Sequence, residues 1–365
     1  MTSNATKKKV FLTGGAGVLG AALIDVLAQS CELICLTHKS PIRHPLVQVV
    51  QGDITAPCFG WEAARFGAFA RSLDWIIHSA AITRLEGDGD EIARTNVVGT
   101  VNMLALAEQG NVPLYHISTA FAQECDYYDG VAPQTSYEAA KRHAETLVEQ
   151  APVRTAIFRP SIIIGDAHDG AMPAFQGFHL TLALLMSGVL PVWPSPAAAH
   201  VDVIARDLVA MCIKSALERE LVGQHFNLCS GAAAPTVEQV VQLLADVAAA
   251  AGRPFNRPKC MHPDVFERLI KPVFLPTFPP AFQPVLERAA LMCRYSTLRT
   301  PLVSSLAQLL PADVLRDRDP LQELRHSVMF LLPRLAAFTR MLRIPAHMLN
   351  RTASAQPVTR DEVSA

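Results

Sequence analysis

The chain has 365 residues, half of them hydrophobic, and a formal net charge of −1 at neutral pH. This length is enough for a nucleotide-binding domain of roughly 200–250 residues and a smaller second lobe. The balanced charge provides no basic field, so we expect no nucleic-acid partner. The longest apolar stretch, residues 180–193, is too short to span a bilayer, so we also expect no transmembrane span.

The N-terminal segment and the cysteines indicate the compartment. Residues 1–9 are polar and run straight into the first predicted strand, which leaves no room for a signal peptide. The eight cysteines are scattered, and none forms a Cys-x-x-Cys pair. Free, mostly buried thiols in a reducing compartment are the simplest interpretation, so we expect a cytoplasmic protein.

Apolar runs of strand length alternate with helical patterns in the first part of the chain. The predicted strands are residues 10–13, 32–37, 47–51, 75–78, 113–118 and 154–159, and the predicted helices are residues 17–29, 61–71, 91–109 and 137–150. Continuous apolar strands are typical of a sheet that is buried on both faces. The pattern predicts an α/β fold, a doubly wound parallel sheet of the Rossmann type.

The pattern changes after Gly165. A loop at 166–177 precedes predicted helices at 178–187, 202–217 and 236–250, an apolar piece at 189–193 and a strand at 225–228. Residues 253–300 are rich in proline with little periodicity, and residues 302–348 look helical with a charged break at 316–319. We predict a dinucleotide-binding core at 1–165, a smaller, mainly helical substrate lobe at 166–350 with segments returning to the core, and a disordered tail at 351–365.

A glycine-rich turn lies between the first strand and the first helix. Glycine permits such a turn and lets a pyrophosphate approach the backbone N–H groups at the start of the helix. The last glycine lets the helix pack close to the strand. This context predicts a dinucleotide site that includes Thr13, Gly14, Gly17, Val18, Leu19 and Gly20.

Tyr137 and Lys141 are four residues apart in a predicted helix and therefore project from one face. A nearby ammonium, together with the positive nicotinamide ring, would lower the pKa of the phenol. Tyr137 could then exchange a proton with a substrate oxygen while hydride moves. Taken alone, this spacing fits a surface pair equally well.

The residues at the ends of three predicted strands support a catalytic role for Tyr137 and Lys141 over a surface pair. The fifth strand ends at Ser118 and Thr119, which places hydroxyls where the nicotinamide ring should lie. The fourth strand ends in the small residues 79–81, which suit a backbone that passes close to a cofactor. The third strand ends at Asp53, whose carboxylate could accept from the adenine amino group.

These motifs resemble the extended short-chain dehydrogenases/reductases over residues 8–230, in the right order. The resemblance implies that Tyr137 is the acid/base, that Lys141 binds the ribose and tunes Tyr137, and that Thr119 holds the substrate oxygen. Asn96 is counted among the cofactor-binding residues, although a role as a buttress of the sheet or of a water relay is favoured for it. The other cofactor-binding residues implied are Ile54, Ser79, Ala80, Ala81, Ser118, Arg159, Pro160 and Ser161.

The branch of the superfamily follows from residues 118–123, Ser-Thr-Ala-Phe-Ala-Gln. This run lacks the aromatic-Gly pair of sugar-nucleotide epimerases and the Asp-Glu pair of dehydratases. With residues 159–166 and 200–203 it is similar to the thioester reductase, carboxylic acid reductase and fatty acyl-CoA reductase (male sterility-like) group. Gly15 and Val18 depart from the commoner residues, and residues past about 250 match no pattern.

That group implies an NADPH-dependent reductase of an acyl thioester, bound to CoA or a carrier protein, or of a related hydrophobic carbonyl, with an aldehyde or alcohol as product. A hydroxysteroid-type dehydrogenase or sugar-nucleotide epimerase is the alternative. A non-catalytic NADP-sensing regulator is a third, but such a sensor needs none of Thr119, Tyr137 and Lys141. An acyl carrier protein and a homodimer are open as partners.

The end of the second strand indicates the cofactor. NAD enzymes favour an Asp or Glu there for the ribose 2′-OH, and residues 36–40 contain neither. His38 and Lys39, with Arg43 as a further candidate, suit a 2′-phosphate instead, so NADPH is favoured over NAD. The alternative is that His38 and Lys39 belong to a solvated loop.

Other conspicuous residues have structural explanations that we favour. No histidine pair has ligand spacing, so we expect no metal. Asp202 is expected to cap the helix at 202–217. Phe175, Phe178 and Trp193 fit an acyl channel but fit an ordinary core better. Residues 330–343 mix apolar and basic residues, and a helix packed on the lobe is favoured over a membrane or carrier-protein surface.

Overall fold

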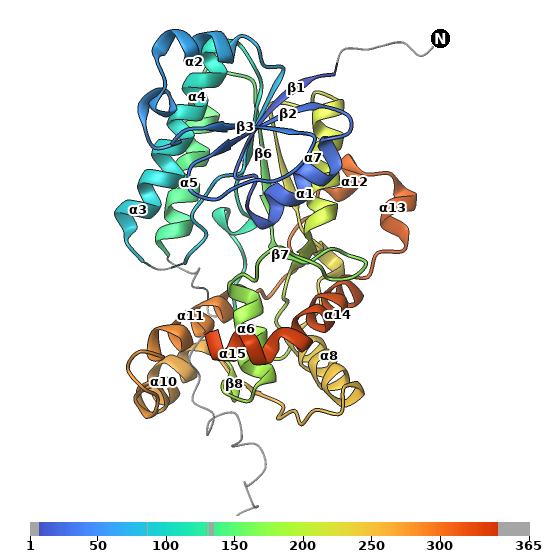
Figure 1. Ribbon diagram of the computed structural model, residues 1–365. Coiled ribbons are helices and arrows are strands. Elements are labelled where there is room, and N and C mark those ends of the chain that lie inside the picture. Colours follow the sequence, from blue (N-terminus) through green and yellow to red (C-terminus); the bar gives the residue numbers. More distant parts are fainter. Residues whose placement is uncertain (1–6, 86, 129, 131–134, 342–365) are drawn as a thin grey trace, which may run out of the picture.

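The computed structural model of the protein describes residues 7–341 except 86, 129 and 131–134. Seven parallel strands form one sheet in the order β10-β6-β5-β4-β1-β2-β3 (Figure 1), which confirms the predicted doubly wound sheet. The strands are β1 (Lys9–Thr13), β2 (Glu32–Thr37), β3 (Val47–Gln51), β4 (Trp75–His78), β5 (Leu114–Ile117), β6 (Thr155–Pro160) and β10 (Gln224–Leu228).

Helices cover both faces of this sheet (Figure 1). Helices α1 (Val18–Leu27) and α7 (Arg206–Glu218) pack together on one face, where Leu23 and Leu208 belong to one buried cluster. On the other face, α2 (Ala63–Ala70) and α4 (Gly99–Gly110) bury Phe66 and Met103 against the sheet, and α5 (Ser136–Gln150) lies beside α4. Alternating residues of each strand thus feed two separate cores, as expected of a doubly covered sheet.

The predicted helix at 91–109 is divided in two. Helix α3 (Gly89–Ala93) leads into a π-helical turn at Arg94–Val98, and α4 follows at Gly99. The turn buries Asn96, whose amide accepts from the backbone N–H of Ile82 at 2.8 Å and donates to its carbonyl at 2.9 Å. Asn96 therefore holds the loop after β4 in place, which is a structural role of the kind that the sequence analysis considered for it.

A second, mainly helical lobe lies below the sheet in Figure 1. It contains α6 (Gly177–Met186), α8 (Val237–Ala250), α9 (Pro263–Val265), α10 (Lys271–Phe274), α11 (Gln283–Cys293), α14 (Pro320–Leu331), α15 (Leu335–Met341), β8 (Val192–Trp193) and β11 (Lys259–Cys260). Residues 253–300, predicted to have little regular structure, hold the eleven-residue helix α11. The tail predicted at 351–365 lies outside the described residues.

The segment predicted to pack on the lobe does so over its described part. Helix α15 lies against α6, and Leu335 is buried. Arg334 covers the ring of Phe330 at 3.7 Å from its centroid and donates to its backbone carbonyl at 2.6 Å. The amphipathic pattern therefore belongs to a helix on the lobe surface, while residues 342 and 343 of the predicted segment lie outside the described residues.

The connection between the sheet and the lobe corrects the role predicted for Asp202. Strands β7 (Ile162–Ile164) and β9 (Val203–Ala205) pair in parallel, and α7 begins only at Arg206. The buried carboxylate of Asp202 accepts from the backbone N–H groups of Ser230 and Gly231 at 2.8 and 3.0 Å. Asp202 therefore ties β9 to the end of β10 and does not cap α7.

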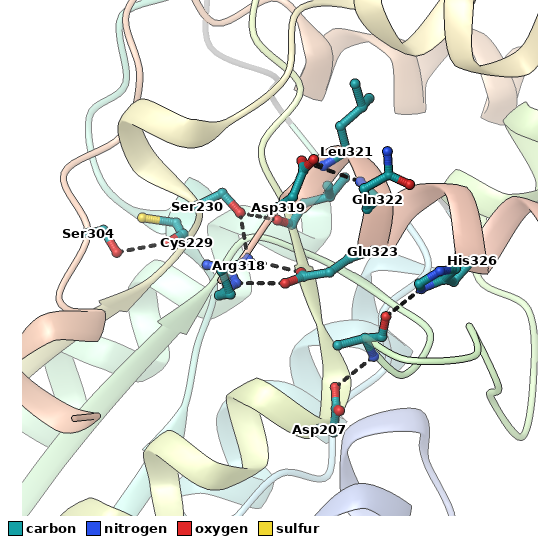
Figure 2. A network of polar contacts seen from close by, with 12 residues as sticks. Asp207, Cys229, Ser230, Ser304, Arg318, Asp319, Leu321, Gln322, Glu323 and His326 are labelled. Carbon is teal, nitrogen blue, oxygen red and sulfur yellow. Dashed lines mark hydrogen bonds and ion pairs between the residues drawn. The ribbon is translucent and has the colours of Figure 1, made fainter. Parts of the chain in front are cut away.

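Polar contacts fasten α14 to the upper part of the molecule (Figure 2). Arg318 makes two bonds to Glu323, at 2.7 and 3.0 Å, and one to the hydroxyl of Ser230 at 3.0 Å. His326 donates through Nδ1 to the carbonyl of Ala167 at 2.7 Å. The C-terminal helices are thus bonded both to the end of β10 and to the loop that follows β7. Along the chain, the short helices α12 (Leu306–Leu309) and α13 (Ala312–Arg316) lie between β10 and α14.

All eight cysteines are free, and five of them, Cys31, Cys35, Cys212, Cys229 and Cys293, are buried, which confirms the expectation of mostly buried thiols. Within the described ranges, no helix has the length and apolar character needed to cross a bilayer. The same residues contain no group of three or more His, Cys, Asp or Glu side chains that could hold a metal ion.

Candidate active site

A cavity of about 880 Å³ begins at the glycine turn and extends to the helical lobe. It lies at the carboxyl ends of the parallel strands, where open α/β sheets hold their ligands. It brings together nineteen of the predicted site residues: Thr13, Gly14, Gly17, Val18, Leu19, Gly20, His38, Lys39, Asp53, Ile54, Ser79, Ala80, Ala81, Ser118, Thr119, Tyr137, Lys141, Pro160 and Ser161.

The glycine turn is packed so tightly that side chains would not fit. Gly14 has φ +77°, and a Cβ there would lie 2.6 Å from the backbone nitrogen of Ala80. A Cβ at Gly20 would lie 2.0 Å from the carbonyl oxygen of Gly14. The turn therefore leaves bare backbone at the start of α1, which fits the phosphates of a dinucleotide.

A chain of hydrogen bonds anchors Thr13 beneath this turn. The hydroxyl of Thr13 accepts from Ala80 N–H at 3.2 Å and forms a second hydrogen bond with Nδ1 of His78 at 2.8 Å. Nε2 of His78 then donates to Thr100 at 3.2 Å, and Thr100 donates to the carbonyl of Asn96 at 2.8 Å. Burial lowers the pKa of His78 to about 3, so the ring is neutral and serves as a structural link.

The three predicted catalytic side chains meet at the middle of the cavity. Tyr137 and Lys141 share one face of α5, and the Thr119 hydroxyl at the end of β5 hydrogen-bonds the Tyr137 phenol. The Lys141 ammonium is buried and donates to the carbonyl of Ile117 at 2.5 Å. The hydroxyl of Ser118 is also buried, and it has no partner among the described residues. An unpartnered donor in a cavity of this kind fits a ligand that supplies the missing bond.

The protein's own groups raise the pKa of Tyr137, and the lowering predicted beside a positive nicotinamide ring stays a prediction. Burial is the largest influence and raises the pKa of the phenol above its usual range, the charge of Glu138 raises it further, and the hydrogen bond from Thr119 only partly opposes them. Burial also lowers the pKa of Lys141 to about 8, although Glu145 opposes this. The phenol is therefore protonated at neutral pH, the state that an acid needs in order to donate.

The opposite end of the cavity fits the adenosine half of a dinucleotide. His38 and Lys39 are exposed at its wall. Asp53 accepts at Oδ1 from the N–H and the hydroxyl of Thr55, both at 2.8 Å. Burial alone would raise the pKa of this carboxyl, but these bonds and the nearby His38 and Lys39 lower it. Asp53 is therefore ionised and placed to accept a hydrogen bond.

Two predicted cofactor residues do not line the cavity. Asn96 is bonded to the Ile82 backbone as described above. Arg159 forms a two-pronged pair with Glu145 of α5, with N···O distances of 2.9 and 2.5 Å, and also donates to Gln123 at 3.4 Å. The guanidinium of Arg159 thus joins β6 to α5 and is turned away from the predicted ligand.

The lobe adds further cavity residues, among them two aromatic residues for which the sequence favoured an ordinary core. Phe175 and Phe178 line the cavity, while Trp193 is fully buried in the core and donates to Ser296 at 2.8 Å. The opposite wall of the cavity includes Arg288, Met292 and Tyr295. Their spacing of four and three residues, along α11 and the turn after it, is the sequence signal that could have identified this wall. Leu180 and Gln176 complete this end of the cavity.

The family comparison agrees with this geometry. Residues 37–213, just under half of the chain, match the family model described as male sterility protein, an NAD-binding domain. Over these residues the chain is similar to that family. Its predicted resemblance to the thioester reductase and male sterility group is confirmed.

Individual relatives match the chain only in part. The chain is 26% identical over 189 residues to the hybrid PKS-NRPS synthetase xenE of Xenoacremonium sinensis, and the match covers 45% of this chain. It spans only about 5% of the length of that synthetase.

Two solved structures share the fold over most of the chain. The terminal R domain from the myxalamid PKS-NRPS pathway has a TM-score of 0.71 at 18% identity, and the likeness covers 91% of this chain and 92% of that one. A thiolation-reductase di-domain from an archaeal non-ribosomal peptide synthetase has a TM-score of 0.63 at 18% identity, with 91% and 76% covered. At these identities the likeness establishes the fold.

Proposed function

We propose that the chain reduces an acyl thioester, carried on CoA or on a carrier protein, to an aldehyde or alcohol with NADPH. The observation that carries this proposal is the continuity of the cavity. It joins the glycine turn to Thr119, Tyr137 and Lys141 and ends at an apolar wall that includes Phe175 and Phe178. Such a wall suits an acyl chain better than a sugar nucleotide, whose hydroxyls and phosphates need polar partners.

The relatives support the carrier. One is a hybrid PKS-NRPS synthetase, and a structural neighbour joins a thiolation domain to a reductase. Both belong to assemblies much larger than this chain, so carriage of the substrate on a thiolation domain is part of the proposal. The free thiols agree with a reducing compartment, and we retain the cytoplasm as the proposed location.

The residues at the centre of the cavity have distinct proposed roles. A bound nicotinamide coenzyme supplies the hydride that reduces the carbonyl carbon. Thr119 and Tyr137 hydrogen-bond the carbonyl oxygen and stabilise the negative charge that develops there. Tyr137 then gives its phenolic proton to that oxygen, and Lys141 favours the resulting phenolate through its charge.

Release of the product follows from the same atoms. The hydroxyl of the hemithioacetal loses its proton as the C–S bond breaks, which leaves an aldehyde, and the departing thiolate takes up a proton to become a free thiol. Solvent returns the proton to Tyr137. A second hydride transfer to the aldehyde would use the same three side chains and give an alcohol.

The preference for NADPH rests on His38 and Lys39. They lie at the wall of the cavity beside the end of β2, and their charges reach the Asp53 carboxylate. The end of β2 has no carboxylate to accept from a ribose 2′-OH. Two cationic side chains there favour the phosphate of NADPH.

The test is NADPH oxidation by the purified chain with acyl-CoAs, acylated carrier domain, long-chain aldehydes, ketosteroids and UDP-sugars as separate substrates. Formation of aldehyde or alcohol from a thioester, with stoichiometric free thiol, is the expected result. Activity with ketosteroids or UDP-sugars alone would favour the alternative function, a hydroxysteroid-type dehydrogenase or a sugar-nucleotide epimerase. Binding of NADPH without any turnover would favour a sensor.

A further inference from the structure

The helix α11 presents one side of its surface to the cavity. Arg288, Met292 and Tyr295 follow one another at intervals of four and three residues, and all three line the cavity. Tyr295 and Met292 lie deeper, beside α5 and α6, while the Arg288 side chain is exposed. Arg288 therefore stands at the outer rim of the substrate end.

Arg288 has no acidic partner among the described residues. Its Nε donates to the backbone carbonyl of Pro284 at 3.3 Å, which leaves the terminal nitrogens of the guanidinium available. Its helical neighbour Glu287 lines a separate, small pocket. A guanidinium free of carboxylates at the rim of a cavity can bind an anion with two parallel bonds.

The remaining cations of the cavity are in other places or already paired. His38 and Lys39 lie at the end of β2, at the adenosine end, and Arg84 is paired with Glu91. Lys141 is bonded to Ile117 in the interior. Helix α11 belongs to the lower lobe in Figure 1, away from α1 and the glycine turn where cofactor phosphates would bind. Arg288 is therefore available to the substrate.

The start of α6 lies beside α11, next to Met292. The cap residue Gln176 makes no side-chain bond to the first turn, and both Gln176 and Gly177 line the cavity. A Cβ on Gly177 would lie 3.4 Å from the sulfur of Met292, one helical turn from Arg288. The positive end of the α6 dipole thus adds to the charge of Arg288.

We propose that Arg288 binds the phosphate of a phosphopantetheine arm, so that the acyl thioester enters the cavity beside Met292 and Tyr295. This rests on the proposed function, because it assigns the recognition of the carrier to a residue of the same cavity. CoA and carrier proteins share this phosphate, whereas an acyl chain or a simple thioester does not contain it. Arg288 is a specificity residue and takes no part in the chemistry.

The experiment measures binding of 4′-phosphopantetheine and of pantetheine by calorimetry, with the full chain saturated with NADP⁺. Wild type should bind the phosphorylated compound at least tenfold more tightly, and Arg288→Gln should remove the difference. Arg268→Gln, at an exposed arginine that does not line the cavity, is the matched control and should retain it. Equal binding of the two compounds by wild type, or no binding of either, would overturn the proposal.

Turnover distinguishes this proposal from the proposed function. Arg288→Gln should raise KM about tenfold for acyl-CoA or for an acylated carrier domain, and leave KM for the acyl-N-acetylcysteamine thioester and for NADPH unchanged. An effect on only one of the two phosphate-bearing substrates identifies the source of the arm. Reduction of thioesters that is indifferent to Arg288 would sink the phosphate site alone, whereas failure to reduce any thioester would sink the proposed function.

Discussion

The buried ammonium of Lys141 donates to the main-chain carbonyl of Ile117 at 2.5 Å, at the end of the strand that carries Thr119. This bond spans helix α5 and strand β5, so it fixes the distance between the elements that hold Tyr137 and Thr119. Lys141 thus has a structural contact as well as its proposed role beside the ribose. The contact places a positive charge in the interior, where burial lowers the pKa of the amine to about 8.

Removing this charge should separate stability from activity. Lys141→Met should abolish thioester reduction and yet stabilise the cofactor-free chain by about 1–3 kcal/mol at pH 7, because the cost of burying an ammonium is removed. The wild-type pKa is lower in the folded state than the ordinary 10.5, so the unfolded chain binds more protons between pH 8 and 10.5. Wild-type stability should therefore gain from this group as the pH rises through that window.

Urea unfolding of wild type and Lys141→Met at pH 7 and pH 10 tests this. The gap between the two proteins should shrink at the higher pH, where the folded wild type carries a neutral amine. A variant that is less stable than wild type at both pH values would show that the bond to Ile117 outweighs the buried charge.

Tyr137→Phe should lower kcat by about 10²–10⁴-fold, because it removes the proton donor while the ring keeps its packing. NADPH binding, measured by fluorescence titration, should be unchanged. Tyr128→Phe is the control, since Tyr128 does not line the cavity. Since burial raises the pKa of Tyr137, reduction should not lose rate through deprotonation of the free enzyme's phenol near neutral pH. Retention of full kcat by the Phe variant would exclude the acid role.

His38→Ala combined with Lys39→Ala should raise the KM for NADPH by about tenfold or more and leave that for NADH unchanged, since charge-assisted bonds contribute roughly 1.5–3 kcal/mol each. The measurement is the ratio of kcat/KM for the two coenzymes. Arg43→Ala is the control, because Arg43 is exposed and does not line the cavity. An unaltered ratio in the double variant would assign His38 and Lys39 to a solvated loop.

The sheet could be predicted because its strands are continuous apolar runs. The loops at the ends of these strands contain functional residues at characteristic positions. Strand β2 was predicted at its observed bounds, Glu32–Thr37, and the glycine turn was found from its position between strand and helix. Both depend on contacts close in sequence. The same holds for Tyr137 and Lys141, since four residues of helix are enough to place them on one face.

The failures come from tertiary partners and from proline. Asp202 looked like a helix cap, but the chain pairs β9 with β7 before α7 can begin. Pro284 lies in the first turn of α11, where a missing N–H costs nothing, so a helix forms in the proline-rich residues 253–300 for which we expected little regular structure. The residues of the lobe that line the cavity could not be predicted, because Arg288 and Tyr137 are far apart in the sequence and no local pattern connects them.

Gly20→Ala should destabilise the chain by about 3 kcal/mol or more and abolish NADPH binding. The added Cβ would lie 2.0 Å from the carbonyl oxygen of Gly14, which is backbone and cannot move without opening the turn. Thermal unfolding and coenzyme titration measure the two effects. Gly89→Ala is the matched control, because its Cβ meets nothing closer than 3.5 Å. Normal coenzyme binding by the Gly20 variant would refute the close packing of α1 on β1.

The pair between Arg159 and Glu145 should matter for folding and leave the coenzyme unaffected. Both side chains are largely buried, and Glu145→Ala would leave the guanidinium unpaired, at a cost of about 3–5 kcal/mol in unfolding free energy. Replacing both residues, with Arg159→Met and Glu145→Leu, should recover most of that loss, because no buried charge remains. The KM for NADPH should stay at the wild-type value in the double variant, since Arg159 does not line the cavity. If the double variant regains stability but has a raised KM for NADPH, Arg159 contributes to coenzyme binding in spite of its bonds to α5.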